Sequence, residues 1–149
     1  MMKVLLFMLF AAIGFKNPAE VVTKEVVIAE SVVAWKGYKV LGNHTGHIRI
    51  KEGNLNFEGE NLVGGNFVID MSTISSTDLE GETAQKLIGH LSSPDFFGIA
   101  EHPTANFKIT NVSSRGKAGD YKITGDITIK GITESITFNT LIDFIYYNI

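Results

Sequence analysis

A strict two-residue alternation of apolar and polar side chains runs through most of this sequence, and it restricts the fold more than any other feature. The alternation is clearest in the segment 121–130, where every second residue is apolar or glycine: Tyr121, Ile123, Gly125, Ile127 and Ile129. Successive side chains of a β-strand point to opposite faces, so the segment is predicted to be an antiparallel strand with one buried face and one solvated face. Shorter runs of the same kind recur from Val26 onward.

Glycine-containing turn signals separate these runs at Gly37, residues 52–54, Gly59, residues 116–120 and Gly131. Short connections of this composition favour hairpins between neighbouring strands. We therefore expect an all-β domain with about seven strands, each with one apolar inner face. Besides the 121–130 segment, the inner faces are expected to carry Ser31, Val33 and Trp35; His44, Gly46, Ile48 and Ile50; Val63, Gly65, Phe67, Ile69 and Met71; Ala105, Phe107 and Ile109; and Ile136, Phe138 and Ile142.

The alternation stops between residues 75 and 98, and a helical insertion is expected at about 78–97. Asp78 is a candidate N-terminal cap, and Leu79, Leu87 and Leu91 form a rough apolar stripe ahead of a proline.

Single-sided strands can bury their apolar faces in a sandwich or in a closed barrel, and periodicity does not distinguish the two. Gly46, Gly65 and Gly125 on the inner faces favour the barrel, because they would leave room inside and ease the bending of strands. A barrel of about eight strands can enclose one small apolar ligand.

Composition excludes several classes of protein. The 149 residues suffice for one domain, and a hydrophobic content of 44% is too high for intrinsic disorder. A formal net charge of -3 gives no general attraction for a phosphate backbone, so no nucleic-acid partner is expected. The sequence contains no cysteine, which excludes disulfides, thiolate metal sites and a lipid-modified N-terminal cysteine.

The amino-terminal residues 1–14 resemble a cleaved signal peptide. A lysine precedes a continuous apolar run that is shorter than a membrane-spanning helix, and small residues follow it at Ala12 and Gly14. A buried N-terminal helix or strand is the alternative. Residues 15–24 are expected to form a linker, residues 25–149 the folded domain, and the mature protein to be periplasmic or secreted without a stable membrane span.

Candidate chemical groups are few. His44 and His47 lie on opposite faces of one predicted strand, so they are not expected to share a metal ion. His44 points inward and is expected either to bond a neighbouring group or to contact a ligand headgroup. His90 and His102 lack a third ligand at a suitable spacing, and no catalytic motif is present; no metal or other cofactor is expected.

Seven short strings occur in a fixed order: Ser31-x-Val33-x-Trp35, Gly42-x-His44-x-Gly46, Gly64-Gly65-x-Phe67-x-Ile69-Asp70-Met71, Asp78-Leu79, His90-Leu91-x-Ser93-x-Asp95-Phe96-Phe97, His102-Pro103-Thr104-Ala105-x-Phe107 and the run from Gly125 to Gly131. In this order and spacing the chain resembles the YceI-like family of exported bacterial proteins over about residues 25 to 140. The resemblance implies an antiparallel lipocalin-like barrel of about eight strands, with a helical insertion between the fourth and fifth, that binds an isoprenoid or another long-chain amphiphile.

The carboxyl-terminal residues 141–149 depart from the family pattern. Members of the family normally continue with a further closing strand, which is absent or replaced here. We therefore expect a C-terminally shortened barrel with open strand edges, lower stability than a full-length relative, and a tendency to form a homodimer or to aggregate through these edges.

A carrier of a long-chain isoprenoid or amphiphilic lipid is the main functional hypothesis. The alternatives are an enzyme that acts on an apolar substrate with His44 or His90 as acid or base, and an interaction module with a solid barrel. The expected ligand-binding residues are Val33, Trp35, His44, Ile48, Ile50, Phe67, Ile69, Phe107, Ile109, Ile127, Ile129 and Phe138.

Overall fold

The computed structural model describes residues 20–142, which form one antiparallel sheet of seven strands and one α-helix. The predicted signal peptide, part of the predicted linker and the last seven residues lie outside this range. The elements are β1 (Val21–Glu25), a 3-10 turn η1 (Ile28–Glu30), β2 (Val33–Lys39), β3 (Gly42–Glu58), β4 (Asn61–Ser76), α1 (Gly81–Ser92), β5 (Thr104–Ser114), β6 (Asp120–Ile129) and β7 (Ile132–Leu141). The predicted all-β class is confirmed.

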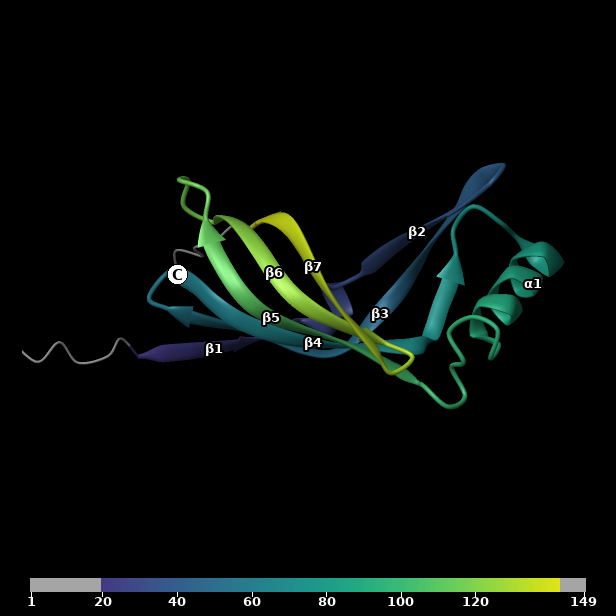
Figure 1. Cartoon of the computed structure of the whole chain (residues 1–149), viewed down its shortest axis with the longest axis horizontal. Coiled ribbons are helices and arrows are strands. Elements are labelled where there is room, and N and C mark those ends of the chain that lie inside the picture. The colour runs from purple at the N-terminus through teal and green to yellow at the C-terminus, as the bar shows by residue number, and fades with distance from the viewer. Residues whose placement is uncertain (1–19, 143–149) are drawn as a thin grey trace, which may run out of the picture.

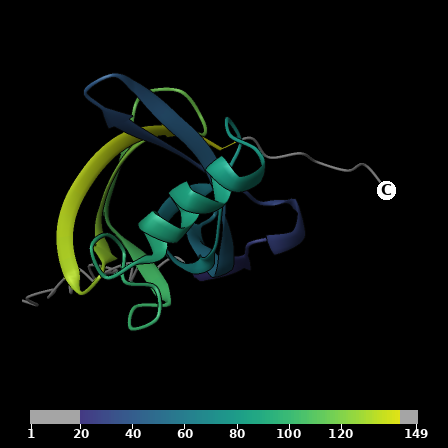
Figure 2. The ribbon, with the colours of Figure 1, turned by 90° about the vertical axis from the view of Figure 1, so that its right-hand side faces the viewer.

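The strands follow the order β1-β3-β4-β5-β6-β7, and β2 also pairs with β3. β2 pairs with the first part of β3, from Gly42 to Ile48, whereas β1 pairs with its last part, from Asn54 to Glu58. The sheet curls strongly but does not close within residues 20–142, because β7 pairs only with β6 (Figures 1 and 2). The expected barrel is therefore open between β7 and the strands β1 and β2.

The helix lies between β4 and β5, as predicted, but begins at Gly81 rather than near residue 78. Asp78 does not cap it, because the N-cap position is Glu80 and no side chain bonds to the first turn. Leu91 is the buried residue of the helix, and Leu87 packs against the same cluster. Figure 2 shows α1 across one end of the curled sheet.

Two of the predicted turns lie inside strands. Gly37 belongs to β2, and residues 52–54 belong to β3, which continues through a register shift between Ile50 and Glu52. The extra residue at this shift is Lys51, so a β-bulge just before residues 52–54 lets the strand continue where a turn was predicted. Residues 21–24, expected in the linker, form most of β1.

A second register shift, between Asn56 and Phe57, reverses the expected face at the start of β4. Val63 was predicted to point inward but is 41% exposed, whereas Leu62 is buried. Leu62 instead joins Phe57 in the core, because one extra residue moves the neighbouring side chain to the other face of the sheet.

Two hydrophobic clusters occupy the concave face. The first is centred on Phe57, Phe107 and Tyr121, and the Tyr121 hydroxyl accepts a hydrogen bond from the Leu62 amide at 3.2 Å. The second lies at the helix end of the sheet and contains Ile48, Met71, Ile74, Leu91 and Ala105.

The inner-face glycines do not leave empty space, contrary to the expectation from the sequence. A Cβ atom on Gly46 would collide with the Trp35 ring and the Ser75 carbonyl oxygen, and one on Gly125 would collide with the Phe107 ring. Trp35 and Gly46 are direct cross-strand partners. Aromatic rings thus lie over glycines of neighbouring strands, which keeps these rings close to the sheet.

Candidate functional site

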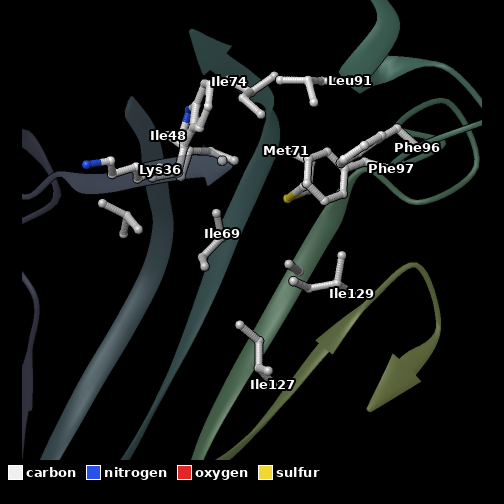
Figure 3. Close-up of a pocket in the computed structure, with 14 residues that line it drawn as sticks. Lys36, Ile48, Ile69, Met71, Ile74, Leu91, Phe96, Phe97, Ile127 and Ile129 are labelled. Atoms are coloured by element: carbon white, nitrogen blue, oxygen red, sulfur yellow. The ribbon is translucent and has the colours of Figure 1, made fainter. Parts of the chain in front are cut away.

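An apolar cavity of about 300 Å³ lies between the concave face of the sheet and the segment from α1 to Phe97; we call it the helix-side cavity (Figure 3). Its volume is at the lower end of the range for small-molecule pockets, about 300 to 1,000 Å³. The lining residues are Val33, Trp35, Lys36, Gly37, Ile48, Ile69, Met71, Ile74, Leu91, Phe96, Phe97, Ala105, Ile127 and Ile129.

A second apolar cavity of about 280 Å³ continues along the sheet; we call it the sheet-side cavity. It shares Val33, Ile69 and Ile127 with the helix-side cavity, so the two are neighbours on one face. Its lining residues are Val33, Ile50, Phe67, Ile69, Phe107, Ile127, Ile136 and Phe138. We call these two neighbouring cavities on the concave face, taken together, the trough.

The walls of the helix-side cavity come from distant parts of the sequence. Trp35 is held in place by a hydrogen bond of 3.1 Å from its Nε1 to the Ser75 carbonyl oxygen. Phe96 and Phe97 meet edge to face with ring centroids 4.8 Å apart, beside Met71 (Figure 3). The Phe97 amide donates to the Leu91 carbonyl at 3.0 Å, which ties the turn after α1 to the helix.

The sheet-side cavity is less covered than the helix-side cavity. Phe107 contacts Phe67 and Phe138, with ring centroids 6.4 and 5.7 Å apart. Ile136 and Phe138 are 39% and 41% exposed, because β6 is the one strand that pairs with β7 among residues 20–142. This end of the trough is therefore open to solvent along β7.

Ten of the twelve ligand-binding residues expected from the sequence line the trough. The other two, His44 and Ile109, are not among the residues that line either cavity. Ile109 is buried in the cluster around Phe57 and Phe107, where it contributes to core packing.

Several residues that line the helix-side cavity were not among the ligand-binding residues expected from the sequence. Met71 and Ala105 continue the inner-face alternation of Ile69 and Phe107, so that pattern could have identified them. Ile74 lies after a change of alternation within β4 and had no such signal. Leu91 required knowledge of how the helical segment packs on the sheet, whereas the adjacent aromatics Phe96 and Phe97 are a sequence signal for either the mouth of a barrel or a plug under a surface loop.

His44 is held between two charged side chains. Its Nδ1 lies 2.8 Å from Asp78 Oδ2, and its Nε2 lies 2.9 Å from Lys39 Nζ. A neutral imidazole with the proton on Nδ1 satisfies both contacts, donating to the carboxylate and accepting from the ammonium. Both ring nitrogens are thus engaged by protein groups, which matches the expected bond to a neighbour and leaves no ring nitrogen for a ligand headgroup.

Asp78 links the end of β4 to β3 rather than starting the helix. Its carboxylate accepts hydrogen bonds from the Thr45 amide and the Ser76 hydroxyl, both at 3.0 Å. The Thr45 amide, with smaller contributions from His44 and Ser76, lowers the pKa of Asp78 to about 2 from the ordinary value of 3.8. The ionised form is therefore the one that the fold stabilises.

We expect Asp78→Ala to lower the thermal unfolding midpoint near neutral pH and to have little effect near pH 2. A folded-state pKa below the unfolded value means that the stabilisation is complete above the ordinary value of 3.8 and is lost as the pH falls through about 2. Thermal unfolding followed by circular dichroism at both pH values measures the difference. Asp95→Ala, which removes an exposed carboxylate after α1, serves as the control. A deficit of equal size at both pH values would contradict the assignment.

The remaining titratable groups suggest no catalytic centre in the described part of the chain. The exposed His90 contacts the Phe96 ring edge-on, with centroids 6.0 Å apart. The Asp70 carboxylate accepts bonds from the hydroxyl and amide of Ser72, and these bonds lower its pKa. Within residues 20–142, no three side chains of the metal-ligating types gather at one point. No helix of the described range is long and apolar enough to cross a membrane.

Lys36 is the one charged residue among those that line the helix-side cavity. Its ammonium end points away from the apolar side chains of the cavity (Figure 3). A surface of this kind can bind an apolar chain by removing it from water. It offers no pair of groups positioned for proton transfer or nucleophilic attack on such a chain.

Comparison with known proteins connects this site to a family. The model of the YceI-like domain matches residues 24–144. Protein YceI of Escherichia coli is 28% identical over 143 residues, covering 92% of this chain and 71% of that protein. A UPF0312 protein of Vibrio cholerae is 29% identical over 103 residues, covering 65% of this chain and 52% of the relative. The chain thus spans about half the length of the Vibrio relatives it matches.

Among solved structures, the crystal structure of BcnA from Burkholderia cenocepacia is similar in fold, with a TM-score of 0.63. It is 20% identical in sequence, and the match covers 76% of this chain and 69% of the BcnA chain.

Proposed function

The chain belongs to the YceI-like domain family, and on this premise we propose that it is an exported carrier that holds an isoprenoid or another long-chain amphiphilic lipid in the trough. The observation that carries the proposal is that two apolar cavities are neighbours on the concave face and share the lining residues Val33, Ile69 and Ile127. An elongated ligand can lie along both of them, whereas a compact ligand would occupy only one.

The driving force for binding is the removal of an alkyl chain from water. Each buried methylene contributes about 0.8 kcal/mol, so ten buried carbons provide about 8 kcal/mol before the costs of association are subtracted. Because the sheet-side cavity is open along β7, part of a bound chain would stay in contact with solvent. Affinity in the micromolar range is therefore the expectation.

Export is the second part of the proposal. It rests on the apolar run in residues 1–14, with its preceding lysine and following small residues. A carrier of a water-insoluble chain has a use in the periplasm or outside the cell, where such molecules must cross an aqueous space.

Native mass spectrometry of protein purified from its host tests the carrier function directly. We expect an added mass that corresponds to a lipid, and its loss after extraction with organic solvent. Trp35 provides a second measurement, because it is the only tryptophan of the sequence and lines the helix-side cavity. When a prenyl alcohol is added to the extracted protein, the Trp35 emission should shift and then reach a plateau as the binding site becomes saturated.

Two results together would overturn the proposal: protein that carries no lipid when purified, and Trp35 fluorescence that does not respond to prenyl or alkyl chains. A bound lipid that is chemically changed during incubation would favour the enzyme alternative instead.

We also propose that a second copy of the chain pairs along the edge of β7 that no strand of the described range occupies. This strand contains no proline or lysine, and Glu134 is its one charged residue, so the usual protections of an exposed edge are absent. An antiparallel pairing that places Ile136 opposite the partner's Phe138 keeps the two glutamates apart. It would also cover apolar side chains that are exposed in one copy.

Ser135→Pro is expected to convert this dimer to a monomer. The two-residue turn at Lys130 and Gly131 pairs Ile129 with Ile132, so alternate residues of β7, Ser135 among them, direct their backbone away from β6. Proline at such a position removes an outward amide and leaves the β6 pairing intact. Light scattering after size-exclusion chromatography distinguishes the two states, and Ser135→Thr is the control. A monomeric wild-type protein would contradict the pairing.

A further inference from the structure

The hairpin between β2 and β3 ends in large apolar side chains that nothing in the described chain covers. Val40 and Leu41 form the turn and are 101% and 87% exposed, and Tyr38 beside them is 79% exposed. We call these three residues the hairpin tip. In Figure 1 the hairpin extends beyond the other strands, near the end of the sheet where α1 lies.

Turn chemistry does not require these residue types. Hairpin turns favour asparagine, aspartate and glycine, because these residues adopt the backbone conformations of a tight turn and tolerate water. Here Gly42, with φ of +106°, takes the left-handed position that follows the turn. The backbone conformation of the turn therefore does not explain Val40 and Leu41, and the described residues cover little or none of their surface.

Cationic and aromatic groups flank the apolar turn. Lys36 Nζ lies 5.2 Å from the centre of the Tyr38 ring, and Lys39 occupies the strand position immediately before the turn. The Asp78 carboxylate nearby is already engaged by His44 and the Thr45 amide. An apolar apex with an aromatic ring and lysines behind it matches the layers of a lipid surface: hydrocarbon, interface and anionic headgroups.

The same hairpin forms a wall of the trough. Val33, Trp35, Lys36 and Gly37 of β2 line the helix-side cavity, only a few residues before the tip. A surface on which the tip rests would therefore lie close to the end of that cavity. An apolar chain that leaves the surface would have a short path through water.

We propose that the hairpin tip inserts into the surface of a lipid bilayer that contains anionic headgroups, so that the protein docks with the helix end of the trough next to the membrane. This identifies the bilayer as the source or destination of the ligand, and in that respect it rests on the proposed carrier function. The docking itself depends only on the tip and its lysines.

The test is co-sedimentation with vesicles of phosphatidylcholine containing a minority of phosphatidylglycerol. The wild-type protein should bind, and binding should weaken as the salt concentration rises. The double variant Val40→Asp/Leu41→Asp should bind the vesicles at least about tenfold more weakly than the wild type, because two apolar side chains lose their contact with hydrocarbon. The matched control is Val27→Asp/Val32→Asp, which makes the same change at two valines that are each 60% exposed; it should bind vesicles like the wild type.

A label provides a measurement that does not depend on a disruptive variant. Because the sequence contains no cysteine, Leu41→Cys creates a unique site for an environment-sensitive fluorophore. Its emission should shift to the blue on addition of vesicles, whereas the same label at Val27→Cys should not respond. Equal responses at the two positions would overturn the docking geometry.

The outcomes separate docking from ligand binding. Both aspartate variants should still bind a prenyl alcohol from solution, as reported by Trp35 fluorescence. Wild-type protein that binds the alcohol but not the vesicles would overturn the docking proposal and leave the carrier function standing. Protein that binds vesicles through the tip but takes up no alcohol would support docking and contradict the carrier function.

Discussion

Replacing Ile69 with glutamate should weaken the binding of prenyl or alkyl chains by about 100-fold or more. Ile69 lines both cavities, so a carboxylate at this position lies at the centre of the trough wherever the ligand sits. A bound apolar chain would have to remove water from an unpaired charge, which is far more costly than leaving a hydroxyl or amide unpaired. Titration followed by Trp35 fluorescence measures the loss.

Asn66→Glu is the matched control for this variant. Asn66 lies on the same strand and is exposed, so the substitution adds the same carboxyl group outside the trough. It should bind the ligand like the wild type. Thermal unfolding of both variants separates a loss of binding from a loss of folding. A folded Ile69→Glu variant with unchanged affinity would place the ligand elsewhere.

Gly125→Ala should destabilise the protein by about 2 to 3 kcal/mol, in the upper range for overpacking of a core. The added Cβ would collide with the Phe107 ring and would lie 2.7 Å from the Lys108 carbonyl oxygen. The ring cannot move away freely, because it also packs against Phe67 and Phe138. Urea unfolding followed by circular dichroism gives the difference in free energy.

Gly64→Ala is the matched comparison, because the same substitution is expected to change the free energy of unfolding in the opposite direction. The nearest atom to a Cβ on Gly64 is Asn56 Nδ2 at 3.7 Å, an ordinary contact. Alanine within a strand is then expected to stabilise the protein by about 0.5 kcal/mol relative to glycine. The two substitutions should therefore change stability in opposite directions. A stabilising Gly125→Ala would show that Phe107 does not rest on this glycine.

The alternation of side chains was sufficient to predict the sheet and most of the trough, because a strand with one dry face must present that face to the core. Val33, Ile69 and Ile127 were identified in this way, although the cavities that they join are formed by segments far apart in sequence. The break in the alternation between residues 75 and 98 predicted the helix, and the family resemblance agreed with this by implying an insertion between the fourth and fifth strands.

The remaining features of the fold and of the candidate site could not be predicted from the alternation of apolar and polar residues. A bulge adds one residue without any composition signal, and for this reason Leu62 rather than Val63 is buried. The bond between His44 and Asp78 joins residues 34 positions apart, so neither alternation nor capping preference could predict it. The inner-face glycines were expected to leave empty space in the barrel, because the sequence does not indicate that the rings of Trp35 and Phe107 lie over Gly46 and Gly125.

The two hydrophobic clusters are not packed equally closely throughout. Around Phe57 and Tyr121 the side chains meet one another, whereas around Met71 the helix and the turn after it enclose a void. Regions with fewer packed contacts open at a lower free energy than the whole molecule unfolds. We therefore expect the helix end to open locally while the strands around Phe57 and Tyr121 stay folded, so that under the proposed carrier function a long chain would enter or leave without global unfolding.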